Sequence, residues 1–323
     1  MANTLTIAVP TYNRYEPLKR LIAEIAPIAK SYKNITIHIQ DNSSEEFQGL
    51  NWEIAKEYNC SYKANQQNIG FGGNLLEIFK NCKSDFLWFL SDDDELHLES
   101  LPALFETIET LESNTTLILP YTCDSEPELY NTCDTWRQST NLRDLVSIGL
   151  PLILFSSAIL PLGHPCKSKA TILDVATKHK DNSYIQIILF YALDRYAPIG
   201  LKISYFDEKL INYKHSRVGR FTLIDLYRSL QQVYCFMQDE SYIDARSQGS
   251  ITRGLLRSHL LMCLQHKGGL KVIKDADSQS MFFAVRGLTS FDIKSTILSL
   301  TLILMPGDLI AKILIARGHT YIE

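Results

Sequence analysis

The sequence predicts an α/β fold, in which a mostly parallel sheet is flanked by helices and is followed by a helical C-terminal region. Up to about residue 100, short apolar runs typical of buried strands alternate with segments whose apolar residues recur at helical spacing. Parallel strands need such crossover helices between them. From Thr222 onward only the helical spacing continues. We therefore expect residues 1–221 to hold the ligand site and residues 222–323 to form a helical region.

The expected elements follow in chain order. Residues 5–9 form a short apolar strand that is stopped by Pro10, and residues 17–29 carry apolar side chains at helical spacing. Residues 35–40 form a β-branched strand that ends in a cluster of turn-forming residues, Asp41 to Ser44. The remaining expectations are helices over 45–58, 71–80, 102–111 and 185–193, strands over 60–63, 85–90 and 117–120, and a strand pair over 202–213.

Composition and charge exclude several classes of protein. The chain has 46% hydrophobic and 21% charged residues, and its net charge of -4 provides no basic field for nucleic acid. Its seven cysteines include no Cys-x-x-Cys pair and no matched histidine spacing, so neither a disulfide framework nor a structural zinc site is expected. Scattered thiols suit a reducing compartment.

The sequence indicates a cytoplasmic protein that can rest on a membrane. The N-terminus enters a strand-like segment directly, without the basic and apolar regions of a secretion signal. Two uncharged stretches do not suit a bilayer crossing. Residues 145–166 are interrupted by Gly and Pro and are typical of a core strand and loop, and residues 295–307 are fewer than the ~18 apolar residues that a span needs.

The C-terminal region leaves three interpretations open. Apolar residues recur at near-helical spacing from Leu298 to Ile313, and the basic residues Lys294, Lys312 and Arg317 flank them. An interfacial helix on an anionic membrane leaflet has this pattern. Core packing and a contact in a homo-oligomer have it as well.

Three adjacent aspartates, Asp92, Asp93 and Asp94, follow the buried strand 85–90. Neighbouring carboxylates repel one another, so a fold that places them at a strand end has to supply a counter-charge. Magnesium or manganese is the natural one, because these cations prefer oxygen ligands and bridge to phosphate through one or two carboxylates. The alternative is a solvated acidic turn that caps a helix starting near Glu95.

Other polar turns belong to the same expected sheet, and the loops at the carboxyl ends of parallel strands converge. The turn Pro10 to Arg14 offers an aromatic side chain, Tyr12, for base stacking and a positive charge for phosphate. Asp41 suits a pyrimidine N–H or a ribose hydroxyl, or else an Asx turn or helix cap. A glycine-rich turn over 68–74 precedes a helix and allows anion binding at the helix N-terminus.

Taken together, these pieces resemble the family 2 glycosyltransferases, which have the GT-A fold. The likeness covers roughly residues 4–96 through TIAVPTYNR, IQDNSS, NQQNIGFGGN and FLWFLSDDDEL, and a looser likeness over 150–220 includes FSSAIL. Among family members the sequence looks nearest to the enzymes that build bacterial surface polysaccharides such as O-antigen and capsule, including abequosyltransferase-like ones. Residues 222–323 show no such resemblance.

The resemblance implies a metal-dependent inverting transfer of a sugar from a nucleotide-sugar donor to a hydroxyl of a glycan or lipid-linked glycan acceptor. Asp181 would be the catalytic base, at the place where the family often has a Glu-Asp pair. Ser91 stands where the family has the first residue of Asp-x-Asp-Asp, so the division of roles within the triplet is open. The nucleotide would contact Pro10, Thr11, Tyr12, Arg14, Asp41, Asn68, Gly70, Asn74 and Asp92, and Mn²⁺ or Mg²⁺ would bind Asp93, Asp94 and His215.

Two other functions compete with this one. A sugar-1-phosphate nucleotidyltransferase also joins carboxylates, metal and nucleotide on an α/β sheet, but it would carry a glycine-rich triphosphate loop where this chain has Thr11 to Arg14. A catalytically degenerate domain that binds glycans or serves as a scaffold would explain the unusual segment around Asp181. Release of pyrophosphate supports the first alternative, and donor hydrolysis excludes the second.

Overall fold

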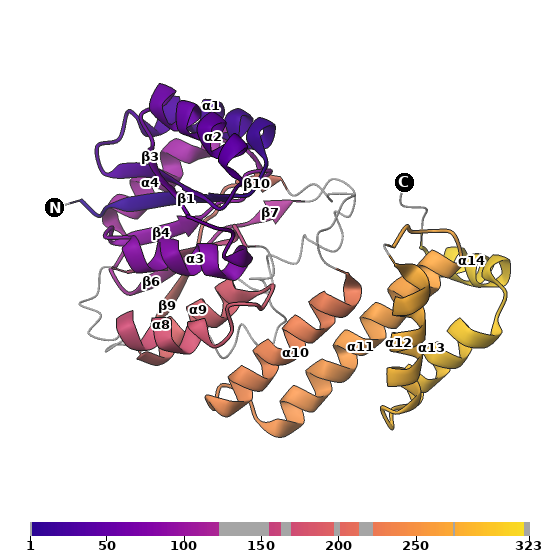
Figure 1. Cartoon of the computed structure of the whole chain (residues 1–323). Helices are drawn as coiled ribbons and strands as arrows, with labels where there is room; N and C mark the ends of the chain where they lie inside the picture. The colour runs from indigo at the N-terminus through magenta and orange to yellow at the C-terminus, as the bar shows by residue number, and fades with distance from the viewer. Residues whose placement is uncertain are drawn as a thin grey trace. The chain divides into compact units, whose positions relative to one another are not determined.

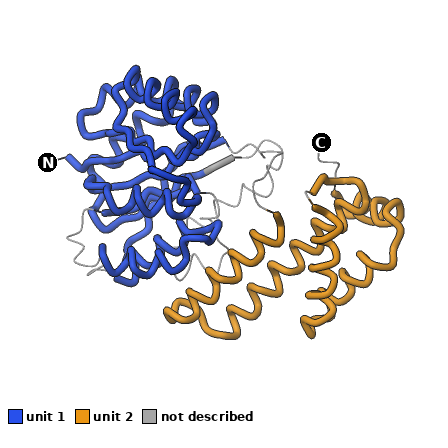
Figure 2. Tube along the Cα trace, in the orientation of Figure 1, with its two compact units in different colours: residues 1–215 blue, residues 216–323 orange. Residues whose placement is uncertain are grey.

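The computed structural model describes residues 2–122, 155–162, 169–196, 201–212, 222–273 and 275–319. The chain divides into two compact units, residues 1–215 and 216–323, which Figure 2 colours separately. The first unit contains the sheets and the second is helical (Figure 1). Within the described ranges, no helix is both long enough and apolar enough to cross a bilayer.

The first unit is built on a seven-stranded, mostly parallel sheet. Its strands lie in the order β3 (Ser61–Ala64), β2 (Ile35–Asp41), β1 (Leu5–Thr11), β4 (Phe86–Phe89), β8 (Ala158–Pro161), β6 (Thr115–Ile118) and β9 (Lys202–Tyr205). Strand β8 runs antiparallel to both of its neighbours, whereas β1 pairs in parallel with β2 and β4. The carboxyl ends of β1, β2 and β4 therefore share one edge. A small second sheet has the order β5 (Glu95–Leu96), β10 (Ile211–Asn212) and β7 (Tyr121–Thr122).

Helices cover both faces of the large sheet (Figure 1). On one face, α1 (Tyr15–Ala29), α2 (Glu45–Glu57) and α4 (Leu101–Thr110) share a hydrophobic core with the strands, and a 3-10 turn over Leu98–Ser100 leads into α4. On the other face, α3 (Gly70–Asn81), α8 (Lys169–Thr177) and α9 (Ile185–Tyr196) pack against one another. The unit is thus a three-layer α/β/α arrangement.

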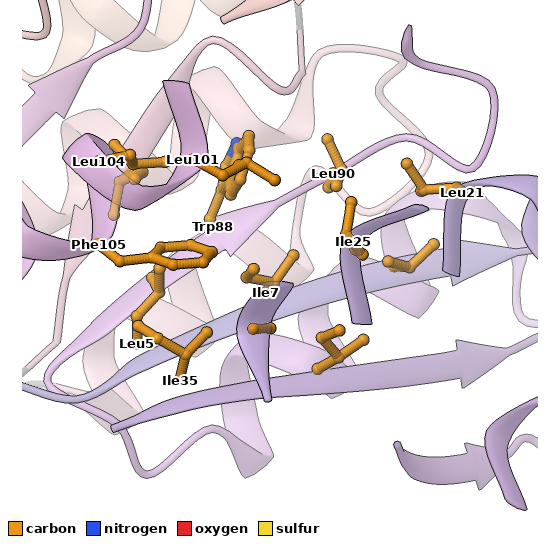
Figure 3. Packing of buried hydrophobic residues seen from close by; sticks show 14 of the residues in the cluster. Leu5, Ile7, Leu21, Ile25, Ile35, Trp88, Leu90, Leu101, Leu104 and Phe105 are labelled. Carbon is orange, nitrogen blue, oxygen red and sulfur yellow. The ribbon is translucent and has the colours of Figure 1, made fainter. Parts of the chain in front are cut away.

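The central strand β1 is buried on both faces, as a central parallel strand requires. Leu5, Ile7 and Val9 on one face and Ala8 on the other have no exposed surface, and Ile7 lies among side chains of α1, α4 and β4 (Figure 3). Trp88 of β4 belongs to the same core, and its indole Nε1 donates to the carbonyl of Ser156 at 2.8 Å. Full burial of one such side chain contributes roughly 1.5–3 kcal/mol. This core holds the strand ends, and hence the turns after them, in place.

Most of the elements expected from the sequence are confirmed, and two expectations are wrong. Strand β1 does not end at Pro10 but continues to Thr11. Pro10 is tolerated because β1 pairs with β4 only over residues 5–8, so no ladder bond to β4 is lost at position 10. The strands expected over 202–213 do not pair with each other, because β9 joins β6 in the large sheet and β10 joins the small one. Of the stretch 145–166, the structure describes residues 155–162, which contain β8.

The second unit consists of helices, as expected. They are α10 (Leu223–Asp239), α11 (Ala245–Lys267), α12 (Ala276–Leu288), α13 (Ile293–Leu304) and α14 (Gly307–Ala316). Each of the side chains of Thr222, Asp244 and Asp292 accepts a backbone N–H of the first helical turn and so caps α10, α11 or α13. Tyr227, Leu260 and Phe283 lie in a separate hydrophobic core that α10, α11 and α12 share. The unit therefore has an interior of its own.

Candidate functional site

The turns after β1, β2 and β4 meet at one edge of the large sheet. Thr11 lies opposite Asp41 in the pairing of β1 with β2, and Ala8 lies opposite Phe89 in the pairing of β1 with β4. The aspartate triplet starts three residues beyond Phe89 and therefore reaches the level of Thr11. A buried hydrogen bond from Thr11 Oγ1 to Asp92 Oδ2, 2.8 Å long, joins the two turns.

Arg14 holds two aspartates of the triplet at once. Its Nη1 lies 3.2 Å from Asp92 Oδ1, and its Nη2 donates to Asp93 Oδ2 at 2.7 Å. Burial lowers the pKa of Arg14, but the charges of Asp92 and Asp93 outweigh this effect and raise it. Arg20 of α1 adds bonds from its Nη2 to the backbone carbonyls of Asp93 and Asp94, at 3.2 and 3.1 Å.

This arrangement changes the interpretation of the triplet. From the sequence, the counter-charge was expected to be a divalent cation, whereas in the structure the guanidinium of Arg14 already provides one for Asp92 and Asp93. Arg14 was expected to lie near phosphate, and here its guanidinium is held by carboxylates. Arg14 is far from the triplet in the sequence, so the sequence alone does not show that it provides the counter-charge.

The pKa values of Asp93 and Asp94 are shifted in opposite directions. Burial raises the pKa of Asp93, but hydrogen bonds from Ser91 and Arg14 outweigh burial and lower it. Burial raises the pKa of Asp94 to about 7, the charges of Asp93 and Asp92 add to this effect, and hydrogen bonds from Ser156 and Ser91 oppose it. The hydroxyl of Ser156 donates to Asp94 Oδ2, and Ser91 Oγ donates to Asp93 Oδ1 at 2.5 Å.

A divalent cation fits this donor set. The carboxylates of Asp93 and Asp94 and the hydroxyl of Ser91 are the oxygen ligands that magnesium and manganese prefer. A carboxyl with a pKa near 7 is also short of compensating positive charge, which a cation would supply. No group of three or more His, Cys, Asp or Glu side chains arranged for a metal is found in the part of the chain that the structure describes. His215, the third expected ligand, lies outside the described residues.

Asp41 is fully buried at the end of β2. Its Oδ1 accepts the backbone N–H of Ser43 at 2.8 Å, which is an Asx turn, and its Oδ2 accepts from Asn51 at 2.8 Å and from the Tyr62 hydroxyl at 2.9 Å. Burial, followed by the charge of Asp41, raises the pKa of Tyr62. The carboxylate therefore organises the turn after β2, and its oxygens are bonded to Ser43, Asn51 and Tyr62 instead of being open to a base.

A network of amides connects this turn to the start of α3. Asn42 Nδ2 donates to Asn68 Oδ1 at 2.6 Å, and Asn42 Oδ1 accepts from Asn65 at 3.0 Å. Asn65 also donates to Asn74 Oδ1 at 2.7 Å, and the N–H of Gly70 donates to Asn68 Oδ1 at 2.9 Å. Gly70 has a φ of +78°, a backbone conformation that glycine adopts without strain. The sequence-predicted residues Asn68, Gly70 and Asn74 thus form one hydrogen-bonded rim.

The turn that carries Asp181 lies against the same end of α3. A Cβ on Gly72 would come within 2.0 Å of the carbonyl oxygen of Lys180, so the glycine lets the backbone of that turn approach the helix. Asp181 itself is exposed, and α9 begins at Ile185, after a turn in which Asn182 Oδ1 accepts the N–H of Tyr184 at 2.8 Å. Asp181 therefore lies in the loop between α8 and α9 rather than in a helix.

Four residues of this region were not among those predicted from the sequence. Asn42, Asn65 and Tyr62 bind other polar groups of the site, and Ser156 donates to Asp94. Asn42 directly follows Asp41, and its position as a polar residue next to a strand end could have identified it from the sequence. Ser156 comes from a distant segment, so only the pairing of β8 with β4 brings it close. Tyr12, expected to stack on a base, is 38% exposed, and Pro10 belongs to β1.

Comparison with known proteins connects this geometry to a family. Residues 6–158 match the family model described as Glycosyl transferase family 2. The abequosyltransferase RfbV of Salmonella typhimurium is 27% identical over 169 residues, which are 49% of this chain and 49% of that protein. The chain thus spans about half the length of this curated relative.

Solved structures agree on the fold. TarS 1-349 of S. aureus in complex with UDP has a TM-score of 0.59 and 15% identity, and the match covers 99% of this chain and 93% of that one. The mannosyltransferase PcManGT of Pyrobaculum calidifontis, in complex with GDP-Man and Mn²⁺, has a TM-score of 0.56 and 11% identity over 98% of this chain and 86% of that one. At these identities the likeness concerns the fold, which is GT-A. Over residues 6–158 the chain therefore matches glycosyl transferase family 2 in sequence.

Proposed function

We propose that the protein is a glycosyltransferase that moves a sugar from a nucleotide-diphosphate sugar to a hydroxyl group of a glycan, with inversion at the anomeric carbon. One observation carries the proposal: Thr11 and Arg14 hold the aspartate triplet at the shared edge of β1, β2 and β4. The complexes of similar folds support a nucleotide-sugar donor, since TarS is described with UDP-GlcNAc and PcManGT with GDP-Man and Mn²⁺.

The donor side of the site divides its roles among three turns. Tyr12 stacks on the base, Asp92 binds the ribose, and the rim formed by Asn68, Gly70 and Asn74 lies beside the donor with the N-terminus of α3. Mn²⁺ or Mg²⁺ held by Asp93 and Asp94 supplies charge neutralisation for the departing nucleotide diphosphate. Arg14 holds the carboxylates of Asp92 and Asp93 in place through one guanidinium group.

Asp181 acts on the acceptor side. Its carboxylate accepts the proton of an acceptor hydroxyl, whose oxygen then attacks the anomeric carbon on the face opposite the diphosphate. The new C–O bond forms as the bond to the diphosphate breaks, so the configuration inverts and the nucleotide diphosphate leaves. The contact between Gly72 and the turn at Lys180 supports this assignment, because it brings the loop of Asp181 to the donor rim.

The acceptor belongs to bacterial surface-polysaccharide synthesis, as a lipid-linked glycan at the cytoplasmic face of the membrane. The support is the likeness to an abequosyltransferase over half of the chain.

A panel of UDP-, dTDP-, CDP- and GDP-sugars tests the donor site. We expect one of them to raise the melting temperature and to be hydrolysed slowly when Mn²⁺ is present. Asp93→Asn abolishes both effects, whereas Glu99→Gln, which changes an exposed carboxylate with 77% side-chain exposure, retains them. If no nucleotide stabilises the protein in the presence of metal, the proposal fails. Pyrophosphate release from a nucleoside triphosphate would instead identify a nucleotidyltransferase.

Asp181→Asn tests the base separately. We expect kcat for transfer to fall about 10²–10⁴-fold while the donor-induced thermal shift is unchanged. Asp174→Asn is the matched control, because Asp174 is an exposed aspartate of the preceding helix, α8. Equal loss in both variants, or no loss in Asp181→Asn, would remove Asp181 from the mechanism. Donor binding without hydrolysis or transfer in the wild type would indicate a degenerate glycan-binding domain.

A further inference from the structure

Helix α13 of the second unit buries two serines together with Leu302 and leaves several aliphatic side chains exposed. Ser295 and Ser299 are fully buried, whereas Ile297 is 57% exposed and Leu304 is 72% exposed. The serines face inward because α12 approaches closely at Gly287, where a Cβ would lie 1.9 Å from Ser299 Oγ. Small residues at a helix contact and aliphatic residues on the outside are typical of helices whose outer face meets an apolar medium.

The neighbouring helices continue this pattern. Thirteen of the sixteen large exposed apolar side chains in the described part of the chain lie between Val272 and Ile315. They include three stripes at helical spacing, which we call the outer stripes: Met281, Val285 and Leu288 on α12, Ile293, Ile297, Leu300 and Leu304 on α13, and Leu309 and Ile313 on α14. Exposed apolar surface of this extent marks a site of interaction with a protein or a membrane.

Charge selects between these partners. Residues 216–323 contain 13 Lys and Arg against 9 Asp and Glu, a net charge of +4, whereas residues 1–215 contain 19 against 27, a net charge of -8. Lys294, Lys312 and Arg317 are exposed beside the outer stripes. Two copies joined through this surface would bring positive charges together, whereas an anionic lipid leaflet complements them.

The same unit contains a pocket suited to an anion. It has a volume of about 250 Å³, and its lining includes Arg253, Arg286, Thr252 and Ser290. Neither arginine has an ion-pair partner among the residues that the structure describes, and the buried Thr252 Oγ1 has no hydrogen-bond partner there. Gly249 makes room for the Arg253 guanidinium, since a Cβ would lie 3.3 Å from its Nη1. Two guanidinium groups and an unused hydroxyl are donors that match a phosphate.

The pocket and the outer stripes are connected. Ser290 lines the pocket, Phe291 after it is fully exposed, and Ile293 begins the stripe of α13. The three-residue separation between Ser290 and Ile293 limits their Cα distance to about 11 Å. The pocket is therefore close enough to the stripe for a phosphate in the pocket and acyl chains against the stripe to belong to the same surface region of one bilayer leaflet.

We propose that the second unit docks on an anionic phospholipid bilayer. The outer stripes enter the boundary between headgroups and acyl chains, and the pocket of Arg253 and Arg286 holds a lipid phosphate. The helices lie in the interface rather than crossing it, in agreement with their length. The docking site is independent of the donor site, and it would keep the enzyme at the surface where a lipid-linked acceptor is found.

Flotation of the full chain with lipid vesicles tests this inference. We expect binding to phosphatidylcholine vesicles that contain phosphatidylglycerol and little binding to phosphatidylcholine alone. We expect Arg253→Gln to lower the partition coefficient about fivefold, because one cation near an anionic leaflet contributes about 1 kcal/mol to the free energy of binding. The matched control Arg246→Gln removes an exposed arginine of the same helix that does not line the pocket, and it leaves binding unchanged.

A second pair of variants tests the outer stripes. Ile297→Gln combined with Leu300→Gln lowers vesicle binding more than tenfold, because two aliphatic side chains no longer enter the bilayer. Leu50→Gln, at a 44% exposed leucine of the first unit, has no effect. Circular dichroism confirms that each variant is folded. Failure of the wild type to bind, or equal binding by the stripe variant, overturns the proposal. The proposal is also overturned if light scattering shows that the wild type is a dimer and the stripe variant is a monomer.

Discussion

Replacing Gly72 by alanine tests how the acceptor loop is attached to the donor site. The added Cβ would lie 2.0 Å from the carbonyl oxygen of Lys180, whereas real Cβ contacts stay beyond 3.0 Å. The turn must therefore retreat by about 1 Å, because the contact is with backbone and no rotamer can relieve it. Overpacking of this kind lowers the free energy of unfolding by about 1–3 kcal/mol. The higher helix propensity of alanine offsets at most about 1 kcal/mol of this loss.

The same shift affects catalysis. Asp181 follows Lys180 in the chain and moves with it, and a displacement of about 1 Å at a reacting group lowers the rate by roughly 10²-fold. We therefore expect Gly72→Ala to lose about 1–3 kcal/mol in urea unfolding and about 10²-fold in kcat, with donor affinity close to that of the wild type. Stability is read from circular dichroism, and kcat is measured well below the unfolding transition.

Gly49→Ala is the control, because it makes the same glycine-to-alanine change in a helix without a steric clash. Gly49 lies inside α2, and a Cβ added there would meet no atom within 4 Å, so alanine stabilises by roughly 0.5–1 kcal/mol and leaves kcat unchanged. A Gly72→Ala protein as stable as the wild type would show that the turn does not lie against α3. Reduced stability with normal kcat would show that Asp181 is not the base.

Three further outcomes follow from the described contacts. Burial raises the pKa of Asp94 to about 7, above the ~3.9 of an unfolded aspartate, so its contribution to stability is complete below about pH 4 and is lost as the pH rises through 7. Asp94→Asn should remove this slope in urea unfolding from pH 5 to 8, and saturating Mn²⁺ should flatten it. Thr11→Val leaves Asp92 without one buried hydrogen bond and should cost about 1–3 kcal/mol in thermal unfolding and weaken donor binding in calorimetry. Asp292→Ala removes the cap of α13 and a bidentate bond to Arg257, at a cost of about 1–2 kcal/mol. The Arg257 hydrogen bond, followed by those from Ser295, lowers the pKa of Asp292, so its contribution is present above about pH 4 and the difference from wild type narrows as the pH falls further.

The position of the aspartate triplet was predictable, and its electrostatics were not. The apolar run from Phe86 to Leu90, shortly before a run of carboxylates, identifies a buried strand and the turn after it, because strand burial is a local pattern. The counter-charge from Arg14 depends on the pairing of β1 with β4, which brings residues 14 and 92 together. The raised pKa of Asp94 depends in addition on the burial of a site that Ser156 helps to form, and Ser156 arrives through the antiparallel strand β8.

For Asp41 and the C-terminal helices as well, the sequence predicts the element but not the tertiary contacts. Periodicity indicates that Asp41 ends a strand and that residues after 222 are helical, but it does not say which side of a helix is covered. On α13 the repeated apolar residues Leu298 and Leu302 pack in the core of the unit, but the close approach at Gly287 also buries two serines and leaves other aliphatic residues outside.

By itself, the sequence determined the alternation of the main strands and helices up to about residue 90, the turns at the sheet edge and the likeness to family 2 glycosyltransferases, since these depend on residues near one another in the chain. The tertiary structure alone decided that Arg14 binds the triplet, that Asp41 is buried by Tyr62 and Asn51, and that the turn before Asp181 lies against Gly72. Those contacts join segments from about ten to more than a hundred residues apart, and their geometry is set by strand pairing and packing rather than by local preference.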